Sequence, residues 1–379
     1  MEEANRFSRF VPERLVEARE ARGYTLTELA GVAGVSHQAI SKYENKKSVP
    51  GYDILEKIAE TLKVPVTYFY KPIISNETGV TFFRSAALAT SKSKKIHLHK
   101  ISWIKEIYKY LEKFFIFPEI NVPRLIDRET YIPTPFVTID QMASEVRRSW
   151  NLGNGPISNM TLLLEKAGIV VARSPFENYK IDACSKWGTG ERPVILLSDD
   201  KTAARSRFDI AHELGHLVLH SKIKQSEFNL KANYKLIESE ANRFASAFLL
   251  PSSSFGSEII SNSLEHLVAL KRRWKVSIQA LAYRAHSIGY FEEHQHIYLR
   301  RKLAKNNQLT REPLDDVLEF EEPILLQQAI KALVEHNVKT KADITSELSL
   351  PREEIEVLAG LEPGYLSSES AKIIPLVFK

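Results

Sequence analysis

The feature of this sequence that most restricts its fold is a pair of histidines, His212 and His216, in a largely apolar segment. A four-residue spacing places both side chains on one face of an α-helix, about 6 Å apart along its axis. A buried helix can carry two imidazoles and the carboxylate of Glu213 only if these groups have partners, because desolvation otherwise costs free energy. A shared Zn²⁺ ion is such a partner. We therefore expect a metal-binding helix rather than two purely structural histidines.

Glu213 has a different expected role. It directly follows His212, so on a helix it points about 100° away, toward the open position of the metal. A carboxylate there can take a proton from water whose pKa the metal has lowered, which is general-base chemistry for peptide hydrolysis. We predict Glu213 as the catalytic residue of a zinc-dependent endopeptidase.

A catalytic zinc site needs a third protein ligand. His220 continues the four-residue spacing, but it lies roughly 12 Å from His212 along the axis, so we interpret it as a helix-end or packing residue. Glu238 lies roughly 55° from the centre of a downstream apolar helical stripe and Glu240 roughly 105° from it. Because a ligand must face the buried side, Glu238 is the expected ligand and Glu240 the alternative. The stripe consists of Ile237, Ala241, Phe244, Ala245 and Phe248.

Two further residues belong to this predicted site. Asn242, one turn after Glu238, is expected to accept a hydrogen bond from a ligand imidazole and fix its tautomer, the alternative being an ordinary exposed amide. Cys184 lies in a segment expected to form a strand beside the site. A lone cysteine is most often a small buried hydrophobic residue. The sharper hypothesis is that its thiolate occupies the fourth zinc position as a displaceable latch.

These motifs resemble a known family. The run from Arg207 through His212-Glu-Leu-Gly-His216, then Glu238-Ser-Glu-Ala-Asn-Arg-Phe-Ala to Leu-Leu-Pro251, resembles the ImmA/IrrE-type metallopeptidases. The resemblance covers about residues 137–290, including a helical continuation at 270–284. It implies a compact zincin-like peptidase of the gluzincin kind. It also implies a substrate class, helix-turn-helix repressor proteins that are cleaved in response to DNA damage or mobile-element signals.

Residues 25–47 have the spacing of a two-helix DNA-reading motif. Thr25 can cap a first helix, Gly34 can form the turn, and Ser36 can cap a second helix. The outward side chains of the second helix are expected to meet base edges, and Gln38 has the geometry to read adenine. The residues that follow that helix, Lys47 included, are expected to bind phosphates. The predicted DNA-binding residues are Ser36, His37, Gln38, Ser41, Lys42, Asn45 and Lys46.

This stretch resembles the XRE-type helix-turn-helix of phage repressors over about residues 11–72. Residues 1–70 contain ten basic and ten acidic residues, so the module has no net charge. Affinity for a double-stranded DNA operator is then expected to depend on local charge placement, on a homodimer that reads two half-sites, or on the lysine-rich run 92–113. For that run a solvated helix face is the alternative. For the whole module the alternative is a helical domain that contacts only proteins.

The length of 379 residues predicts two or three domains. We expect an α+β, mostly helical chain. Its predicted parts are a five-helix DNA-binding domain at 1–72, a linker with a basic helix at 73–136, a zincin-like peptidase domain with a small sheet at 137–290, and a small helical C-terminal domain at 291–379. A single cysteine, no apolar run near the roughly 20 residues that span a bilayer, and no apolar signal core indicate a cytoplasmic protein without a membrane partner.

The predicted function combines these parts. We expect a DNA-binding transcriptional regulator with zinc-dependent endopeptidase activity, which acts on a protein substrate such as a repressor. The first alternative is a transcription factor whose peptidase-like domain senses or binds a partner without turnover. An antitoxin-type regulator is a third reading, and it rests on analogy of fold alone.

Overall fold

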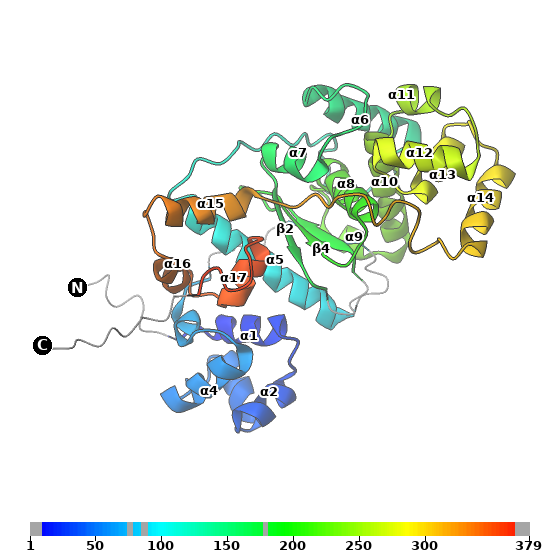
Figure 1. The fold of residues 1–379 in the computed structure, drawn as a ribbon. Coiled ribbons are helices and arrows are strands. Elements are labelled where there is room, and N and C mark those ends of the chain that lie inside the picture. Colours follow the sequence, from blue (N-terminus) through cyan, green and yellow to red (C-terminus); the bar gives the residue numbers. More distant parts are fainter. Residues whose placement is uncertain (1–9, 74–78, 85–89, 177–180, 368–379) are drawn as a thin grey trace, which may run out of the picture. The chain divides into compact units, whose positions relative to one another are not determined.

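The computed structural model describes residues 10–73, 79–84, 90–176 and 181–367 (Figure 1). It divides the chain into two compact units. The first unit lies within 1–75, 102–115 and 326–379, and the second within 76–101 and 116–325. The predicted mostly helical α+β fold is confirmed. The predicted boundaries after residues 72, 136 and 290 differ from this division, and the predictions for residues 1–9, 74–78, 85–89, 177–180 and 368–379 lie outside the described residues.

The N-terminal module of the first unit follows the predicted caps. Thr25 accepts a hydrogen bond from the backbone N–H of Glu28 at 3.2 Å, and the Glu28 carboxylate accepts one from Thr25 N–H at 2.7 Å. Gly34 ends the helix with φ of 68°, and Ser36 caps the next helix through Ala39 N–H at 3.2 Å. The helices are α1 (Pro12–Ala21), α2 (Leu26–Ala33), α3 (His37–Glu44), α4 (Tyr52–Leu62) and a 3-10 helix (Val66–Tyr70).

The C-terminal residues complete this first unit. Lys71 Nζ donates a hydrogen bond to the carbonyl oxygen of Leu348 at 2.5 Å, and Arg22 pairs with Glu354 at 2.5 Å. The segment from residue 326 onward therefore shares a unit with the DNA-binding module, whereas we predicted a separate domain from residue 291. The helices concerned are α15 (Leu325–Glu335), α16 (Lys341–Leu348) and α17 (Arg352–Leu358).

The second unit is built on a four-stranded sheet with the order β1-β3-β4-β2. β2 and β4 are parallel, and β3 pairs antiparallel with both β1 and β4. The edge strand β1 comes from the region that we predicted as a linker, so this strand is part of the second unit rather than of a connecting segment. The strands are β1 (Thr81–Phe83), β2 (Val170–Ser174), β3 (Ala183–Lys186) and β4 (Val194–Ser198).

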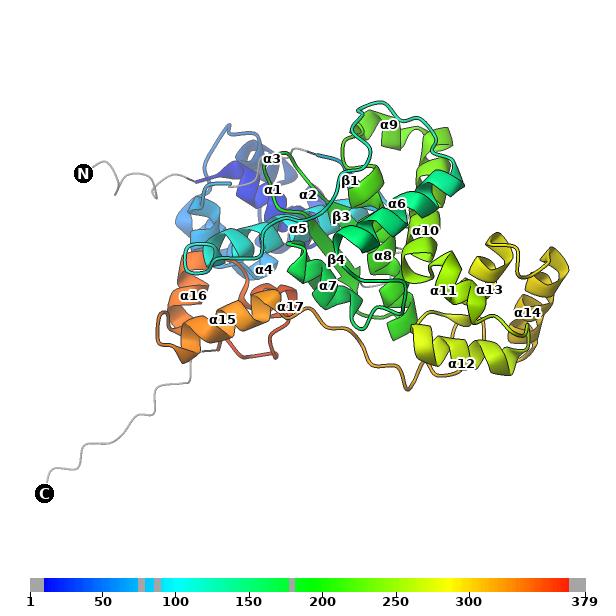
Figure 2. The ribbon, with the colours of Figure 1, turned by 90° about the horizontal axis from the view of Figure 1, so that it is seen from above.

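The helix that carries the two histidines is the buried centre of the second unit. It packs against β3, β4 and α10, and α10 also packs against α6 (Figure 2). Gly215 permits the close approach to α10, since a Cβ there would lie 3.2 Å from the carbonyl oxygen of Ala241. The helices of this unit are α6 (Phe136–Ser149), α7 (Met160–Lys166), α8 (Ala203–Leu219), α9 (Gln225–Asn229), α10 (Lys231–Leu249), α11 (Ser252–Ser257), α12 (Leu264–Trp274), α13 (Ile278–Ser287) and α14 (Glu293–Lys305).

The lysine-rich run forms α5 (Ser91–Leu111), which contributes residues to both units. Trp103 and Lys105 are buried, and Lys100 Nζ donates a hydrogen bond to Ser174 Oγ at 2.5 Å. The helix is therefore in part a packing element, whereas Lys92 and Lys95 near its start are exposed. Within the described ranges, no helix combines the length and apolarity that a bilayer crossing requires.

Candidate metal centre

The side chains of α8 and α10 converge on one point. Nε2 of His212 and Nε2 of His216 lie 3.0 Å apart. The Glu238 carboxylate lies 3.2 Å from the His216 nitrogen and 3.6 Å from the His212 nitrogen. All three candidate ligand atoms lie within 4.8 Å of one another. The structure thus brings the three predicted metal ligands together.

This arrangement fits a cation. Two imidazole nitrogens that face each other at 3.0 Å repel one another when both are bare, unless a positive charge lies close to them. Oε1 of Glu238 is buried and, among the described residues, has no hydrogen-bond partner. Two histidines and one carboxylate form a donor set that catalytic Zn²⁺ sites use, with one position left for substrate.

Glu240, the alternative ligand, is engaged elsewhere. Its Oε1 accepts hydrogen bonds from Tyr131 Oη and from Thr134 N–H, both at 2.7 Å. Its Oε2 lies 3.0 Å from His220 Nε2. Contrary to our expectation, Glu238 is not the more buried of the two glutamates, because its side chain is 15% exposed and that of Glu240 only 4%. Glu238 is the more exposed of the two residues because it lines a cleft.

His220 ends α8, where we expected a helix-end residue. It is buried, and its Nδ1 lies 3.2 Å from Nδ1 of His216. Burial lowers the pKa of His220 to about 4, although the hydrogen bond with Glu240 opposes this shift. It is therefore a neutral imidazole in contact with a candidate ligand, on the side away from the ligand cluster.

Glu213 is fully buried beside this cluster. One carboxylate oxygen, Oε2, accepts a hydrogen bond from Ser185 Oγ at 2.5 Å. The other, Oε1, has no hydrogen-bond partner among the described residues. The pKa of Glu213 is raised to about 8, chiefly by burial, with the Ser185 hydrogen bond opposing the shift and the Glu238 charge adding to it. Sequence reasoning missed Ser185, whose only signal was its place in the predicted strand beside the site.

Cys184 is the neighbour of Ser185 on β3. Successive side chains of a strand point to opposite faces, so the thiol points away from the face that meets Glu213. Burial raises the pKa of the Cys184 thiol, which keeps it protonated. Among the described residues, Cys184 is not in the group of side chains whose ligand atoms converge. This placement supports the buried hydrophobic role and does not support a thiolate latch.

Asn242 lies on α10, one turn after Glu238. Its Oδ1 accepts a hydrogen bond from Nδ1 of His212 at 3.0 Å. This bond places the proton of His212 on Nδ1 and leaves Nε2 free to face the ligand cluster.

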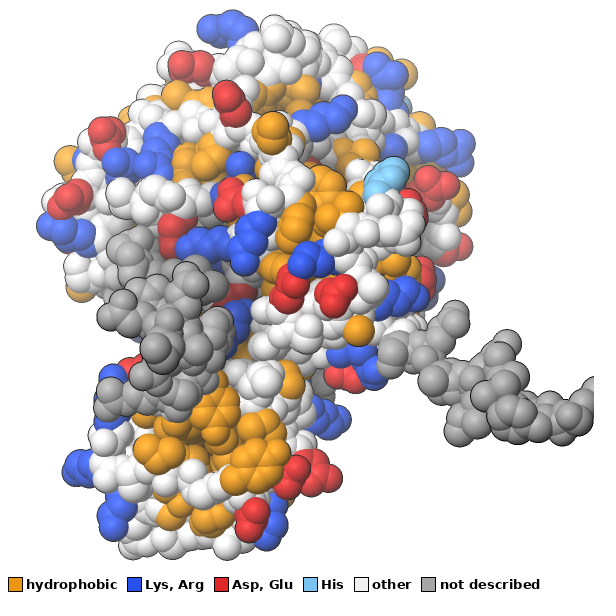
Figure 3. Space-filling view, turned by 90° about the vertical axis from the view of Figure 1, so that its left-hand side faces the viewer, with side chains coloured by type: hydrophobic (Ala, Val, Ile, Leu, Met, Phe, Trp, Pro, Cys, Tyr) orange, Lys and Arg blue, Asp and Glu red, His pale blue; other side chains and the backbone are white. Residues whose placement is uncertain are grey.

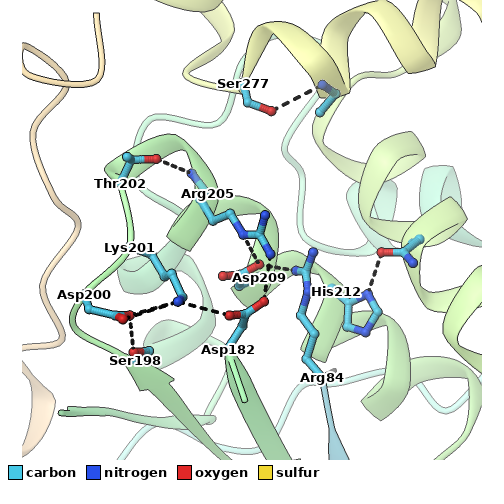
Figure 4. Close-up of polar contacts among 12 residues, drawn as sticks. Arg84, Asp182, Ser198, Asp200, Lys201, Thr202, Arg205, Asp209, His212 and Ser277 are labelled. Atoms are coloured by element: carbon cyan, nitrogen blue, oxygen red, sulfur yellow. Dashed lines mark hydrogen bonds and ion pairs between the residues drawn. The ribbon is translucent and has the colours of Figure 1, made fainter. Parts of the chain in front are cut away.

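A cleft of about 950 Å³ opens beside the ligands, and both Glu238 and Asn242 line it. Arg84, directly after β1, also lines the cleft and pairs with the buried Asp209 beside His212 (Figure 4). The aromatic ring of Phe208 lies under the Arg84 guanidinium, 5.2 Å from it. Sequence reasoning missed Arg84, because no local motif connects it with residues more than a hundred positions away.

A second charged group extends this cleft wall. Asp182 pairs with Arg205 at 2.7 Å and with Lys201 at 3.2 Å (Figure 4). Lys201 also pairs with Asp200 at 3.1 Å. The cleft therefore presents paired charges next to the ligand cluster.

The predicted DNA-binding residues lie on α3 and directly before and after it. Ile40 and Tyr43 face the core of the module, whereas Ser41 is half-buried. Asn45 Nδ2 donates a hydrogen bond to the carbonyl oxygen of Ser41 at 2.8 Å, and Lys46 pairs with Glu13. The exposed residues are Ser36, His37, Gln38, Lys42, Asn45 and Lys46. On the face drawn in Figure 3, basic and acidic side chains are interspersed, in agreement with a net charge of only +5.

Comparison with known proteins identifies two domain types. Residues 15–69 match the helix-turn-helix family model, and residues 164–286 match the model of the IrrE N-terminal-like domain. Both predicted resemblances are thereby confirmed.

Curated relatives resemble the N-terminal module. A putative HTH-type transcriptional regulatory protein of Methanocaldococcus jannaschii is 50% identical over 52 residues, which are 14% of this chain and 16% of that protein. The HTH-type transcriptional regulator SutR of Escherichia coli is 37% identical over 65 residues, which are 17% of this chain and 36% of that protein. A solved Mycobacterium tuberculosis transcriptional regulator aligns over 49% of this chain and 51% of its own, with 18% identity and a TM-score of 0.29, too low to support an argument.

Proposed function

We propose that this chain, which joins a helix-turn-helix module to an IrrE N-terminal-like domain, is a DNA-binding transcriptional regulator that is also a zinc-dependent endopeptidase. The observation that carries the enzymatic part is the convergence of His212, His216 and Glu238 at a cleft, with Glu213 beside them. We assign DNA binding to the α3 surface and peptide hydrolysis to the α8–α10 site.

The chain's own residues account for the proton transfers. When bound, a zinc ion supplies Lewis acidity, which polarises a peptide carbonyl and lowers the pKa of water. Glu213 takes up a proton at Oε1, the oxygen without a hydrogen-bond partner among the described residues, and passes it to the leaving amine. Ser185 holds the other oxygen of Glu213 at 2.5 Å and so orients the carboxylate. Asn242 holds the ring of His212 in the tautomer that binds a metal through Nε2.

The proposed partners follow from the two modules. The α3 surface takes a double-stranded DNA operator, and a homodimer would read two half-sites, as helix-turn-helix proteins commonly do. The cleft takes a segment of a protein substrate, and the resemblance to ImmA/IrrE-type enzymes points to a repressor or a related regulatory protein. A regulator that binds a partner without turnover is the alternative.

Metal content is the first experiment. Elemental analysis of the purified wild-type protein should give about one zinc per chain. His216→Ala and Glu238→Ala should lose it, and Glu145→Ala, which removes an exposed glutamate of α6, should keep it. A wild-type protein that binds no metal when zinc is supplied would rule out the enzymatic part of the proposal.

Turnover is tested separately with Glu213→Gln. This variant keeps all three ligands but lacks the proton acceptor, so it should bind zinc and retain an uncleaved substrate. Proteins captured by the variant in cells should appear as fragments when the wild type is expressed. If the captured protein stays intact with both wild type and Glu213→Gln, the domain binds its partner without cleaving it.

A further inference from the structure

Behind His216 lies a buried chain of three polar side chains. Nδ1 of His216 is 3.2 Å from Nδ1 of His220, and Nε2 of His220 is 3.0 Å from Oε2 of Glu240. All three side chains are almost fully excluded from solvent. None of these contacts involves Nε2 of His216, the nitrogen that faces the ligand cluster.

The hydrogen bond between His220 and Glu240 has a defined direction. Oε1 of Glu240 already accepts two hydrogen bonds, from Tyr131 Oη and Thr134 N–H. The carboxylate has no proton to donate, so it accepts a hydrogen bond from Nε2–H of His220. In a neutral His220 ring the proton on Nε2 leaves Nδ1 bare, and Nδ1 then accepts a hydrogen bond from Nδ1–H of His216. That leaves Nε2 of His216 without a proton.

The ring of His216 is also held in its plane. Phe82 of β1 stacks on it with 4.5 Å between the ring centroids and 5° between the planes. The ring of His216 is thus contacted by Phe82 of β1 and by His220 at the end of α8. Tyr131 and Thr134 act one step further out, on Glu240 of α10. Phe82, Tyr131 and Thr134 all lie outside the region that matches the IrrE N-terminal-like domain.

We propose that Glu240 and His220 are positioning residues that hold His216 in the tautomer with its proton on Nδ1, so that Nε2 is ready to bind a metal. The inference deepens the proposed function, since it assigns a role to two residues behind the same site. Hydrogen bonds to the outer nitrogen of a ligand imidazole orient the ring and raise its basicity, and their loss typically weakens metal binding about 10- to 100-fold.

One nearly isosteric substitution should reverse the direction of the hydrogen bonds that run from Glu240 through His220 to His216. In Glu240→Gln, Thr134 N–H and Tyr131 Oη still require an acceptor, so the amide oxygen stays with them and the NH₂ group faces His220. That NH₂ group donates to Nε2 of His220, which moves the His220 proton to Nδ1. His216 must then accept at Nδ1 and carry its own proton on Nε2, where it blocks the metal.

The experiment has two readouts. In metal-free wild-type protein with ¹⁵N-labelled histidine, long-range ¹H–¹⁵N correlation should show His216 protonated on Nδ1, and in Glu240→Gln it should show the proton on Nε2. Chelator competition should show a zinc Kd that is about 10- to 100-fold weaker in Glu240→Gln. On a His220→Phe background, Glu240→Gln should add no further loss, because the connection to His216 is already broken.

The matched control is Glu165→Gln. Glu165 is also a buried carboxylate that accepts backbone hydrogen bonds, from Ile324 at 3.1 Å and Leu325 at 2.9 Å, so this variant should keep the wild-type Kd. The proposal is overturned if metal-free wild-type His216 carries its proton on Nε2, or if Glu240→Gln keeps the wild-type tautomer and Kd. If wild-type His216 shows the expected tautomer but the protein binds no zinc, the positioning role stands and the peptidase proposal fails.

Discussion

Glu213 is the residue whose environment most strongly determines how the proposed site works. It is a buried acid between the neutral donor Ser185 and the second carboxylate Glu238. In the metal-free protein, burial and the neighbouring carboxylate favour its protonated form. A bound cation would reverse that preference, because it attracts the ionised form. The same residue would therefore hold a proton in the metal-free protein and accept one when a metal is bound.

A pH dependence of stability follows for the metal-free protein. The pKa of Glu213 is about 8 when folded, against an ordinary value of 4.5. Between these values the unfolded chain loses a proton that the folded chain keeps, so this group's contribution to stability falls as pH rises, by at most about 1.4 kcal/mol per pH unit. Glu213→Gln cannot titrate, so its stability relative to wild type should increase from pH 5 to pH 8. Urea unfolding at several pH values measures this, and parallel profiles would contradict it.

At the scale of elements, α3 presents the predicted DNA-reading surface. Gln38 is exposed near its N-terminal end, and Lys47 is exposed directly after it. A side chain that contacts a base edge affects some sequences more than others, whereas a phosphate contact affects all sequences alike.

Two substitutions should separate these roles. Gln38→Ala should weaken binding to the selected operator by about 1–3 kcal/mol and relax the preference for one base pair. Lys47→Ala should weaken binding to all sequences similarly and reduce the slope of log K against log salt by about one. Selection from random DNA, followed by titration at several salt concentrations, provides the measurement. If Gln38→Ala lost equal binding free energy on operator and on random DNA, Gln38 would contact the DNA phosphate backbone rather than a base edge.

The edge strand β1 is the second element with a testable role. Gly79 precedes it with φ of +87°, and a Cβ there would lie 2.6 Å from the carbonyl oxygen of Trp187. Gly190 has a similar φ of +72°, but its Cβ would meet nothing within 4 Å. The two glycines differ in steric clash and share the backbone conformation.

Alanine at these two positions should therefore have unequal effects. Both substitutions should cost about 1 kcal/mol of stability because alanine disfavours positive φ. Gly79→Ala should cost more, since the clash with a backbone oxygen displaces β1 and its Phe82 contact with His216. Denaturant unfolding and zinc affinity report the two consequences. Equal unfolding free energies would show that β1 tolerates the shift.

At the scale of the whole molecule, the two proposed activities belong to different compact units. The α3 surface lies in the first unit and the three candidate ligands lie in the second. No residue that we assign to DNA binding is also assigned to the metal centre. Perturbations at two sites without shared contacts are usually additive.

We therefore expect the activities to be separable by mutation. Glu238→Ala should lose zinc and bind the operator with wild-type affinity, and Gln38→Ala should lose operator affinity and keep its zinc. Fluorescence anisotropy with operator DNA and metal analysis test both halves. A change in operator affinity on zinc removal would instead reveal a coupling free energy between the sites, and the reciprocal effect of DNA on zinc affinity would have to equal it.

Several features were predictable because they depend on residues close together in the sequence. The spacing of His212 and His216 places them on one helix face, whatever the rest of the chain does. The caps at Thr25 and Ser36 are hydrogen bonds to groups three residues away. Helical periodicity and capping chemistry are complete within one or two turns, so the sequence alone determined these features, as well as the pairing of the two domain types.

The tertiary structure alone decided the contacts between distant segments. Glu238 and Glu240 lie on one helix, and periodicity cannot show that Tyr131 and Thr134, 106 to 109 residues away, bind Glu240. Nor can it show that Glu238 converges with the two histidines. It also cannot show that a supposed linker supplies β1, or that the C-terminal helices join the DNA-binding unit. The physical reason is that a side chain's partner depends on which surfaces meet when the chain packs, and that is a property of the whole fold.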